Sequence, residues 1–500
     1  MMSFRAGFWT KRYSSKVYFA GTFVLYALYL LTTSMQVQHY DAGYYWGLAH
    51  NFRKYDFFSL YHFSSAFRGY LLPLLYYPLT VAEGLFLGAH TNDAIKVIGA
   101  AWAAGLFGVV APKLWERVTG TTLGTGRRLL FVLLGFLFWR DHFNFLLSDF
   151  PAVLALLTAL LATCYAPRAW AGLVAGACIT AALYIRPISL LALPPLLLLL
   201  VWQAWRQRQP GRSLGRALLT TLSGFALSFA LVALPQYLIN RNNFARHSPF
   251  VLGLGDGDEF KINGVDNLYL FQLNEGLQLQ KYESNVGQDY SKLQVFYLDP
   301  AGRNLLAQTQ AGRNKFDTYG KYFRFVARYP CDMAALYTRH IFNGLDVLYP
   351  GPYLERVLAP TLPVALPNYL VLFLAAVVLV ARGGRVRPWQ WLLLAALLVT
   401  CAGSVPTVIE CRFFLPLHLL VYALVSFGWP ASWTWSAATR EQRLGFGLAG
   451  TMWVLVCLVL SASTQMALEV QPKTLQRLQE PTPQELQDLQ PEPNPNQPTW

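Results

Sequence analysis

Long apolar runs, separated by short polar segments, fill most of the chain. About 11 of them have roughly 16 to 23 residues, close to the length of about 20 residues with which a helix crosses the hydrocarbon core of a bilayer. The pattern therefore predicts an all-α polytopic membrane protein with about 11 transmembrane helices. The runs lie at 17–34, 94–114, 129–146, 151–166, 170–185, 187–205, 217–238, 360–381, 389–405, 412–430 and 444–463.

The composition fits a chain that is solvated by lipid. Of its 500 residues, 54% are hydrophobic and only 13% are charged, which is too apolar for an ordinary soluble domain. The formal net charge of +14 would suggest nucleic acid as a partner of a soluble protein, but here the basic residues gather in short loops between the apolar runs. The six cysteines lack the spacing of zinc ligands or of a disulfide framework.

The distribution of Lys and Arg predicts which side each loop faces. Basic residues precede the first apolar run, and no cleavage site follows it, so we expect an uncleaved anchor with a cytoplasmic N-terminus. Short cytoplasmic loops are enriched in Lys and Arg, and we assign the later basic loops to the cytoplasm. These loops contain Lys113, Arg117, Arg127 and Arg128; Arg168; Arg206, Arg208, Arg212 and Arg216; Arg382, Arg385 and Arg387; and Arg440 and Arg443.

One further apolar stretch, 70–89, is long enough to span but contains Pro73, Pro78 and Glu83. If it spanned, basic loops that follow it would move to the external side, against the positive-inside bias. We therefore predict that 70–89 forms a helix that lies in the outer membrane interface or is re-entrant.

These assignments divide the chain into four parts. Residues 1–238 form an N-terminal transmembrane module, whose external loop at 35–93 carries interfacial helices. Residues 239–359 are rich in polar residues and predict an external soluble region of α or mixed structure. Residues 360–463 form the C-terminal transmembrane helices, and the Pro/Gln-rich tail at 464–500 is predicted to be disordered.

Charged residues recur at the ends of apolar runs on the predicted external face. A charge in hydrocarbon costs roughly 2.5 to 3.5 kcal/mol on insertion scales, so these groups either pair with each other or serve a site. Guanidinium groups fit phosphate, and a carboxylate can accept a proton from a hydroxyl, so the set suits displacement of a sugar from a lipid phosphate. The catalytic candidates are Asp41 and Asp149, the candidates for binding the donor phosphate are Arg68, Arg186 and Arg412, and the supporting residues are Glu410, Tyr44, Tyr45 and His62.

The order of these motifs resembles the GT-C superfamily of membrane glycosyltransferases. Within that superfamily it is most similar to the bacterial branch with the lipid A aminoarabinose transferase and the protein O-mannosyltransferases. The resemblance covers the first 250 residues, and a later turn, "VIECRFFLPLHLL", is similar to an acidic-x-Arg-aromatic turn of these proteins. The first motifs are "HYDAGYYWGLAHNF" (39–52), "RGYLLPLLYYPL" (68–79), "SDFP" (148–151) and "GLVAGACITAALYIRP" (172–187).

The resemblance implies a role for several residues. It places the proposed base or acceptor-positioning group on Asp41, the second-loop acid on Asp149 and a contact to the lipid phosphate on Arg186. Two departures are visible, since Ala42 replaces the second acid of a frequent Asp-Glu pair and Arg68 stands where a Lys-Pro pair is common. The implied activity is transfer of a sugar from a polyprenyl phosphate carrier to a glycan, lipid or protein hydroxyl, on the periplasmic face of a bacterial inner membrane, in cell-envelope biosynthesis.

Each candidate also has a purely structural alternative. Asp41 and Asp149 both lie where a helix begins and are candidates for helix caps. Arg186 precedes Pro187 and could extend to lipid headgroups, while the acid and the base of "IECRFF" could form a local ion pair. The "GLGDGDEF" stretch (253–260) lacks the register of an EF-hand loop.

Cofactor and function classes follow from the same residues. The four histidines of the first external loop show no ligand spacing, so no cofactor is expected, and a divalent metal is the less favoured alternative. A transporter or flippase would use the same charges to bind and release a substrate, but repeated halves are not visible in the sequence. A non-catalytic partner of envelope assembly that binds polyprenyl lipid would need the same residues, so this alternative stays open.

Overall fold

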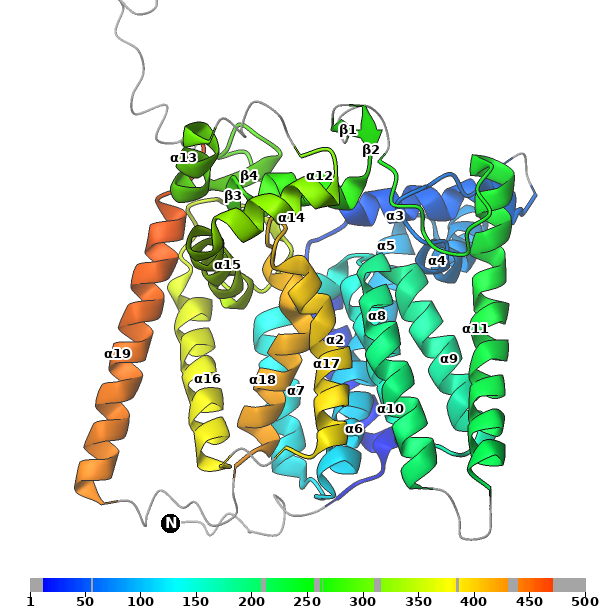
Figure 1. The fold of residues 1–500 in the computed structure, drawn as a ribbon, viewed down its shortest axis with the longest axis horizontal. Helices are drawn as coiled ribbons and strands as arrows, with labels where there is room; N and C mark the ends of the chain where they lie inside the picture. Colours follow the sequence, from blue (N-terminus) through cyan, green and yellow to red (C-terminus); the bar gives the residue numbers. More distant parts are fainter. Residues whose placement is uncertain are drawn as a thin grey trace, which may run out of the picture.

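A computed structural model describes residues 12–54, 57–207, 213–255, 261–262, 264–309, 316–383, 386–429 and 439–470. In these residues the chain is mainly helical, as predicted. The long helices stand side by side, and short helices and strands cover one end of the bundle (Figure 1). This arrangement lets every backbone group of a helix bond within the helix, as an apolar environment requires.

Each predicted apolar run contains one to three helical elements. By length and composition, six helical stretches of the described residues can cross a membrane: Ser15–Thr32, Leu71–Thr119, Pro187–Arg206, Leu214–Phe244, Leu362–Ala381 and Arg440–Gln465. Shorter apolar helices of 10–17 residues cover four other runs. The bundle helices are α2 (Ser15–Thr32), α5 (Thr91–Ala103), η5 (Ala104–Val110), α6 (Ala111–Thr119), α7 (Thr125–Trp139), α8 (Asp149–Thr163), α9 (Ala169–Ile185), η7 (Pro187–Ala192), α10 (Leu193–Arg206), α11 (Leu214–Phe244), α16 (Leu362–Ala381), α17 (Pro388–Ser404), α18 (Leu415–Phe427) and α19 (Arg440–Gln465).

The first predicted external loop contains two helices, α3 (Tyr40–Asn51) and α4 (Leu71–Ala82). Both lie at the end of the bundle that also carries the strands (Figure 1). After α4 the chain passes through a π-helical turn, and Gly88 adopts a positive φ of 47° before α5 begins. The apolar helical stretch continues to Thr119, so the position of 70–89 relative to a membrane stays a prediction.

The predicted soluble region is mixed in structure. Its predicted start at residue 239 lies inside α11, which continues to Phe244. A three-stranded sheet has the order β4-β3-β5, with β3 antiparallel to β4 and parallel to β5, and β1 and β2 form a separate pair. Its elements are β1 (Lys261–Ile262), β2 (Val265–Asp266), α12 (Leu268–Gly276), β3 (Leu279–Asn285), β4 (Gln294–Leu298), α13 (Pro300–Gln308), α14 (Tyr319–Arg328), α15 (Pro330–Leu345) and β5 (Tyr353–Leu354).

The prediction of a disordered tail from residue 464 is wrong for its first residues. The backbone N–H of Leu298 in β4 donates to the Ala467 carbonyl oxygen at 2.8 Å, and that of Glu469 donates to the Phe296 carbonyl oxygen at 3.0 Å. The segment after α19 therefore joins the edge of the sheet, because unpaired β4 backbone groups offer it partners. Residues 471–500 lie outside the described residues.

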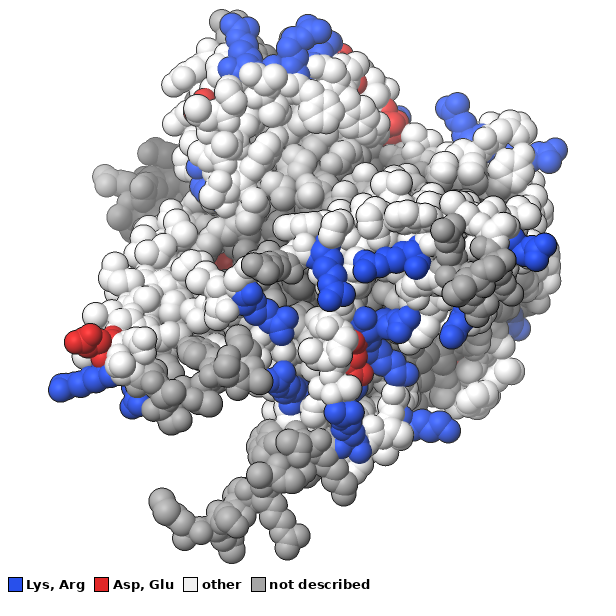
Figure 2. Space-filling view, turned by 60° about the horizontal axis from the view of Figure 1, so that its bottom comes forward, with Lys and Arg blue, Asp and Glu red and all other residues white. Residues whose placement is uncertain are grey.

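The two ends of the bundle differ in charge. Basic side chains gather on the end opposite the strands, which Figure 2 shows turned toward the viewer. Helices alternate in direction, so the basic loops of the sequence meet there. The exposed basic residues of this end include Arg12, Lys16, Lys113, Arg117, Arg168, Arg206, Arg216, Arg382, Arg387, Arg440 and Arg443.

Small residues bring α9 and α11 into close contact. A Cβ added at Gly172 would lie 2.1 Å from the Thr221 carbonyl oxygen, and one added at Gly176 would lie 2.4 Å from the Phe225 carbonyl oxygen. The two glycines are four residues apart and so lie on one face of α9, as in the small-xxx-small pattern of membrane helices. This packing fixes α9, whose last residue immediately precedes Arg186.

We expect Gly172→Ala to destabilise the fold, because its Cβ would meet backbone atoms that cannot rotate away. Overpacking of this kind typically costs about 1–3 kcal/mol. Gly21→Ala is the matched control, since nothing lies within 4 Å of its added Cβ and alanine favours a helix over glycine by about 1 kcal/mol. Thermal unfolding in one detergent measures both variants, and equal melting temperatures would contradict the close packing.

Candidate active site

Asp41 lies in the first turn of α3, held in place by the sheet. Tyr40 has a positive φ of 44°, a conformation that side chains rarely adopt. The Tyr40 hydroxyl donates to the Asn285 carbonyl oxygen, and the Tyr353 hydroxyl donates to the His39 carbonyl oxygen at 2.7 Å. Residues of β3 and β5 therefore fix the start of α3 and the direction of the Asp41 side chain.

Arg412 links all three predicted carboxylates. Its Nε and Nη2 donate to the two oxygens of Glu410 at 2.5 and 2.9 Å, and Nη2 also donates to Asp41 Oδ2 at 3.0 Å. Its Nη1 lies 3.5 Å from Asp149 Oδ2. The local ion pair of "IECRFF" is thus present, and it is part of a larger network.

The turn that carries Arg412 is fixed against β3. The backbone N–H of Tyr282 donates to the Ile409 carbonyl oxygen at 3.1 Å, and Lys281 and Ile409 form a parallel bridge. The short helix η10 (Cys411–Phe414) follows directly and leads into α18. The predicted soluble region therefore positions the guanidinium that joins the site.

Asp149 pairs with Arg186, and the prediction that it caps α8 is wrong. The N-cap of α8 is Ser148, and Asp149 is the first residue of the helix. Its Oδ1 forms an ion pair with Arg186 Nη1, while Oδ2 has no hydrogen-bond partner among the described residues. Arg186 sits at the end of α9 because Pro187 lacks an N–H to continue the helix.

Arg68 completes the network from the loop before α4. Its Nη2 donates to Asp41 Oδ1 at 2.7 Å, and its guanidinium lies over the rings of Tyr45 and Phe67. The next residue, Gly69, leaves no room for a Cβ, which would lie 2.1 Å from the Tyr184 carbonyl oxygen. The loop can therefore approach the end of α9 closely and bring Arg68 to Asp41.

The network is electrically balanced, with three carboxylates and three guanidiniums, and it is not equally buried. The Asp149 side chain is 2% exposed and that of Arg412 is 8% exposed, whereas Asp41 is 31% exposed. Burial raises the pKa of the Asp41 carboxyl, but the guanidiniums of Arg68 and Arg412 outweigh this and lower it to about 2. Burial and the Arg412 guanidinium lower the pKa of Arg186 to about 10. A ligand therefore reaches the network most easily at Asp41, which is ionised at neutral pH.

The structure places the three supporting residues differently. Tyr45 is buried beneath Arg68, and the Arg68 guanidinium carbon lies 5.3 Å from the centroid of the Tyr45 ring. The Tyr44 ring stacks on Phe67 at 5.3 Å, one residue from Arg68. His62 instead contacts the Phe52 carbonyl oxygen at 3.4 Å and the ring of Phe57.

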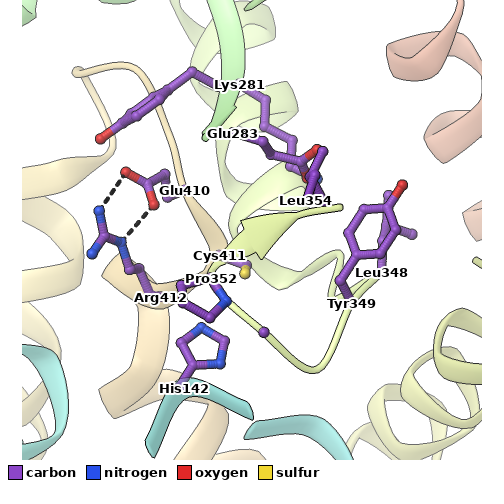
Figure 3. A pocket seen from close by; sticks show the side chains of 12 residues that line it. His142, Lys281, Glu283, Leu348, Tyr349, Pro352, Leu354, Glu410, Cys411 and Arg412 are labelled. Atoms are coloured by element: carbon purple, nitrogen blue, oxygen red, sulfur yellow. Dashed lines mark hydrogen bonds and ion pairs between the residues drawn. The ribbon is translucent and has the colours of Figure 1, made fainter. Parts of the chain in front are cut away.

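A second charged pair, absent from the predicted site, lies across a small pocket from Glu410 and Arg412 (Figure 3). Lys281 Nζ lies 2.6 Å from Glu283 Oε1, and the Tyr297 hydroxyl donates to Glu283 Oε2 at 3.1 Å. The pocket, with a volume of about 20 Å³, is large enough for a water molecule. His142 and Tyr349 also line it.

The sequence did contain a signal for this pair. In "LQKYESN" (279–285) the two charges stand two residues apart, so on a strand they lie on the same face. The signal alone did not indicate that this face is covered by the turn at 406–414. The burial of Lys281 and the partial burial of Glu283 follow from that tertiary contact.

Metal-ligating groups do not cluster in the described part of the chain: no group of three or more His, Cys, Asp or Glu side chains is arranged to hold a metal ion there. Most of the "GLGDGDEF" stretch, from 256 to 260, lies outside the described residues. Comparison with family models, curated proteins and solved structures finds no match for this chain. The resemblance to the GT-C superfamily therefore rests on the motifs themselves.

Proposed function

We propose that this protein is a membrane glycosyltransferase of the GT-C type, which moves a sugar from a polyprenyl phosphate-linked donor to a hydroxyl of a glycan, lipid or protein. The observation that carries the proposal is the network of three carboxylates and three guanidiniums at one end of an apolar bundle. Guanidiniums at the end of an apolar bundle suit the phosphate of a donor whose polyprenyl tail stays in lipid.

The donor phosphate would have to compete with carboxylates that already occupy the guanidiniums. Arg68 and Arg186 are the more accessible, with side chains 25% and 19% exposed. We assign them the donor phosphate, and we assign Arg412, which is held by Glu410 at two atoms, the role of fixing the carboxylates.

This competition would change the pKa of the Asp41 carboxyl and so its strength as a base. In the resting protein its low pKa makes it a poor base. When the phosphate engages Arg68, Asp41 loses a neighbouring positive charge and its pKa rises. It can then take the proton of the acceptor hydroxyl as that oxygen attacks the anomeric carbon. The bond from this carbon to the phosphate oxygen breaks, and its electron pair leaves with the phosphate, whose charge the arginines neutralise.

The proposal includes an orientation and a location. The basic end of the bundle would face the cytoplasm and the site would face the external or periplasmic side, which is the orientation that the positive-inside bias favours. With about 11 transmembrane helices, the chain would lie in the inner membrane of a bacterium.

The pH dependence of transfer tests the role of Asp41. The pH dependence of kcat/KM reports the pKa values of essential groups in the free enzyme, and the pH dependence of kcat reports their pKa values in the enzyme–substrate complex. We expect the acid limb of kcat to lie at least about one pH unit above that of kcat/KM, because phosphate binding removes a charge that lowers the pKa. In Arg68→Gln the acid limb of kcat/KM should move up toward that of kcat.

Coincident acid limbs in the wild type, or an unchanged kcat/KM profile in Arg68→Gln, would contradict this mechanism. The same carboxyl contributes to folding. Because its pKa is lowered, it stabilises the fold above its unfolded pKa of about 3.9, and this stabilisation is lost as the pH falls toward about 2. This range overlaps the acid limb of kcat/KM, so folding is measured at each of these pH values together with the rate.

A further inference from the structure

A long apolar groove lies between helices of the C-terminal half and α6. It has a volume of about 1120 Å³ and is bordered by α6, α16, α17, α18 and α19, with α15 at one end. Most of its lining is aliphatic, as at Leu114, Ala375, Leu393, Leu420 and Val456. The site residues Asp41 and Asp149 do not line it.

The other end of the groove is basic. Arg382 and Arg387 line it there, together with Gln390 and Trp115. Arg382 Nε donates to the Gly428 carbonyl oxygen at 2.5 Å, and its guanidinium lies over the Trp115 ring. In the described residues neither arginine has an ion pair with a carboxylate; the nearby Glu116 is held by Arg128 at 2.8 Å.

An unsatisfied donor lies beside these arginines. The indole Nε1 of Trp115 is buried and has no hydrogen-bond partner among the described residues. A buried N–H without an acceptor costs about 1–3 kcal/mol. Partial burial and, to a smaller extent, the positive charge of the nearby Arg127 lower the pKa of Arg382. Both features favour a ligand with anionic or acceptor oxygens.

The length of the groove matches one leaflet. Its α16 side runs from Leu372 to Arg382, which is about 15 Å at 1.5 Å per residue. Half of the hydrocarbon thickness of about 30 Å is the same length. The groove therefore fits the depth of an acyl chain that belongs to the leaflet at the basic end.

We propose that this groove is a binding site for an anionic phospholipid, with an acyl chain along α16 and α18 and the phosphate at Arg382 and Arg387. The Trp115 indole N–H donates to a phosphate or ester oxygen of that lipid. The site lies at the end of the bundle opposite Asp41 and does not depend on the proposed transferase activity.

Native mass spectrometry of the full chain, purified in detergent and offered equal amounts of phosphatidylglycerol and phosphatidylcholine, tests the proposal. We expect the wild type to retain phosphatidylglycerol preferentially. Each basic residue near a membrane surface contributes about fivefold to binding of an anionic lipid, so Arg382→Gln and Arg387→Gln should each reduce retention about fivefold. Arg440→Gln, an exposed arginine at the same end that does not line the groove, is the matched control and should leave retention unchanged.

Ala375→Phe tests the groove itself, since the larger side chain should exclude the acyl chain and abolish retention of either lipid. Size-exclusion profiles confirm that each variant is folded. Equal retention of the two lipids by the wild type, or retention that is unchanged in both arginine variants and in Ala375→Phe, would overturn the proposal. Retention of a polyprenyl phosphate in place of the phospholipid from a mixed membrane extract, if it is lost in Arg382→Gln and Ala375→Phe, would also overturn it.

Discussion

Replacing Arg412 with Gln is expected to lower the free energy of unfolding by about 3–5 kcal/mol, the cost of leaving buried charges without a partner. Arg412 is the one described residue that contacts Glu410, Asp41 and Asp149 together. Without it, Glu410 loses both of its hydrogen bonds from the Arg412 guanidinium, although its side chain is only 8% exposed. Sugar transfer should disappear as well, because the carboxylates would separate.

Thermal unfolding in detergent, followed by scanning fluorimetry, measures this effect. Arg440→Gln is the control, because it removes the same charge at an exposed position away from the site. Surface substitutions usually change the free energy of unfolding by no more than about 0.5 kcal/mol. If both variants melted at the same temperature, Arg412 would not hold the network together.

Replacing Asp41 with Asn is expected to reduce the rate of transfer by about 10²–10⁴-fold, the usual contribution of a general base. Binding of the donor should be retained or become tighter, since the amide no longer competes with phosphate for Arg68 and Arg412. Isotope-labelled transfer and donor binding, measured on one nanodisc preparation, separate the two effects.

Asp93→Asn is the matched control for Asp41. Asp93 also lies in the first turn of a helix, but its carboxylate faces His90 at 3.2 Å and Lys96 at 3.9 Å. Its replacement removes a partner of the buried Lys96 but no contact of the charged network, so the transfer rate should stay within about twofold of the wild type. A variant at Asp41 with the wild-type rate, or one whose donor affinity falls in step with its rate, would remove Asp41 from the chemistry.

The sequence predicted the positions of the charged residues well for a physical reason. Each apolar run reverses the direction of the chain, so counting runs decides the end at which a loop lies. This rule brought Asp41, Asp149, Arg186 and Arg412 to one end of the bundle, where the structure joins them. The exposed basic residues of the opposite end follow the same rule.

The partners of these charges were beyond the reach of such counting. Asp149 was expected to cap α8, but Ser148 occupies the N-cap position, without a side-chain capping hydrogen bond, and the Asp149 carboxylate pairs with Arg186 instead. Hydropathy carries no information about which carboxylate meets which guanidinium, because that depends on the relative rotation of helices. The position of Arg412 also depends on a long-range contact, because the turn that carries it is hydrogen-bonded to β3.

The mixed region shows the same limit. Its composition indicated a water-soluble segment, yet Lys281 is buried and the Glu283 side chain is only 13% exposed beside the site. The joining of residues 467–469 to β4 was also unpredicted, because a segment of Pro-rich context has no strand pattern of its own. Long-range pairing creates both features, and local sequence does not encode it.

The formation of a new glycosidic bond distinguishes a glycosyltransferase from a lipid-binding partner or a transporter. We would supply the wild-type protein in nanodiscs with a panel of polyprenyl phosphate donors carrying a labelled sugar, together with membrane glycans and lipids as acceptors, and follow the label by mass spectrometry. The account predicts that the label becomes covalently attached to an acceptor, with release of polyprenyl phosphate, and that Asp41→Asn abolishes this. Donor that binds, or crosses the bilayer of a proteoliposome, with its sugar bond intact in every case would contradict the account and favour a lipid-binding partner or a transporter.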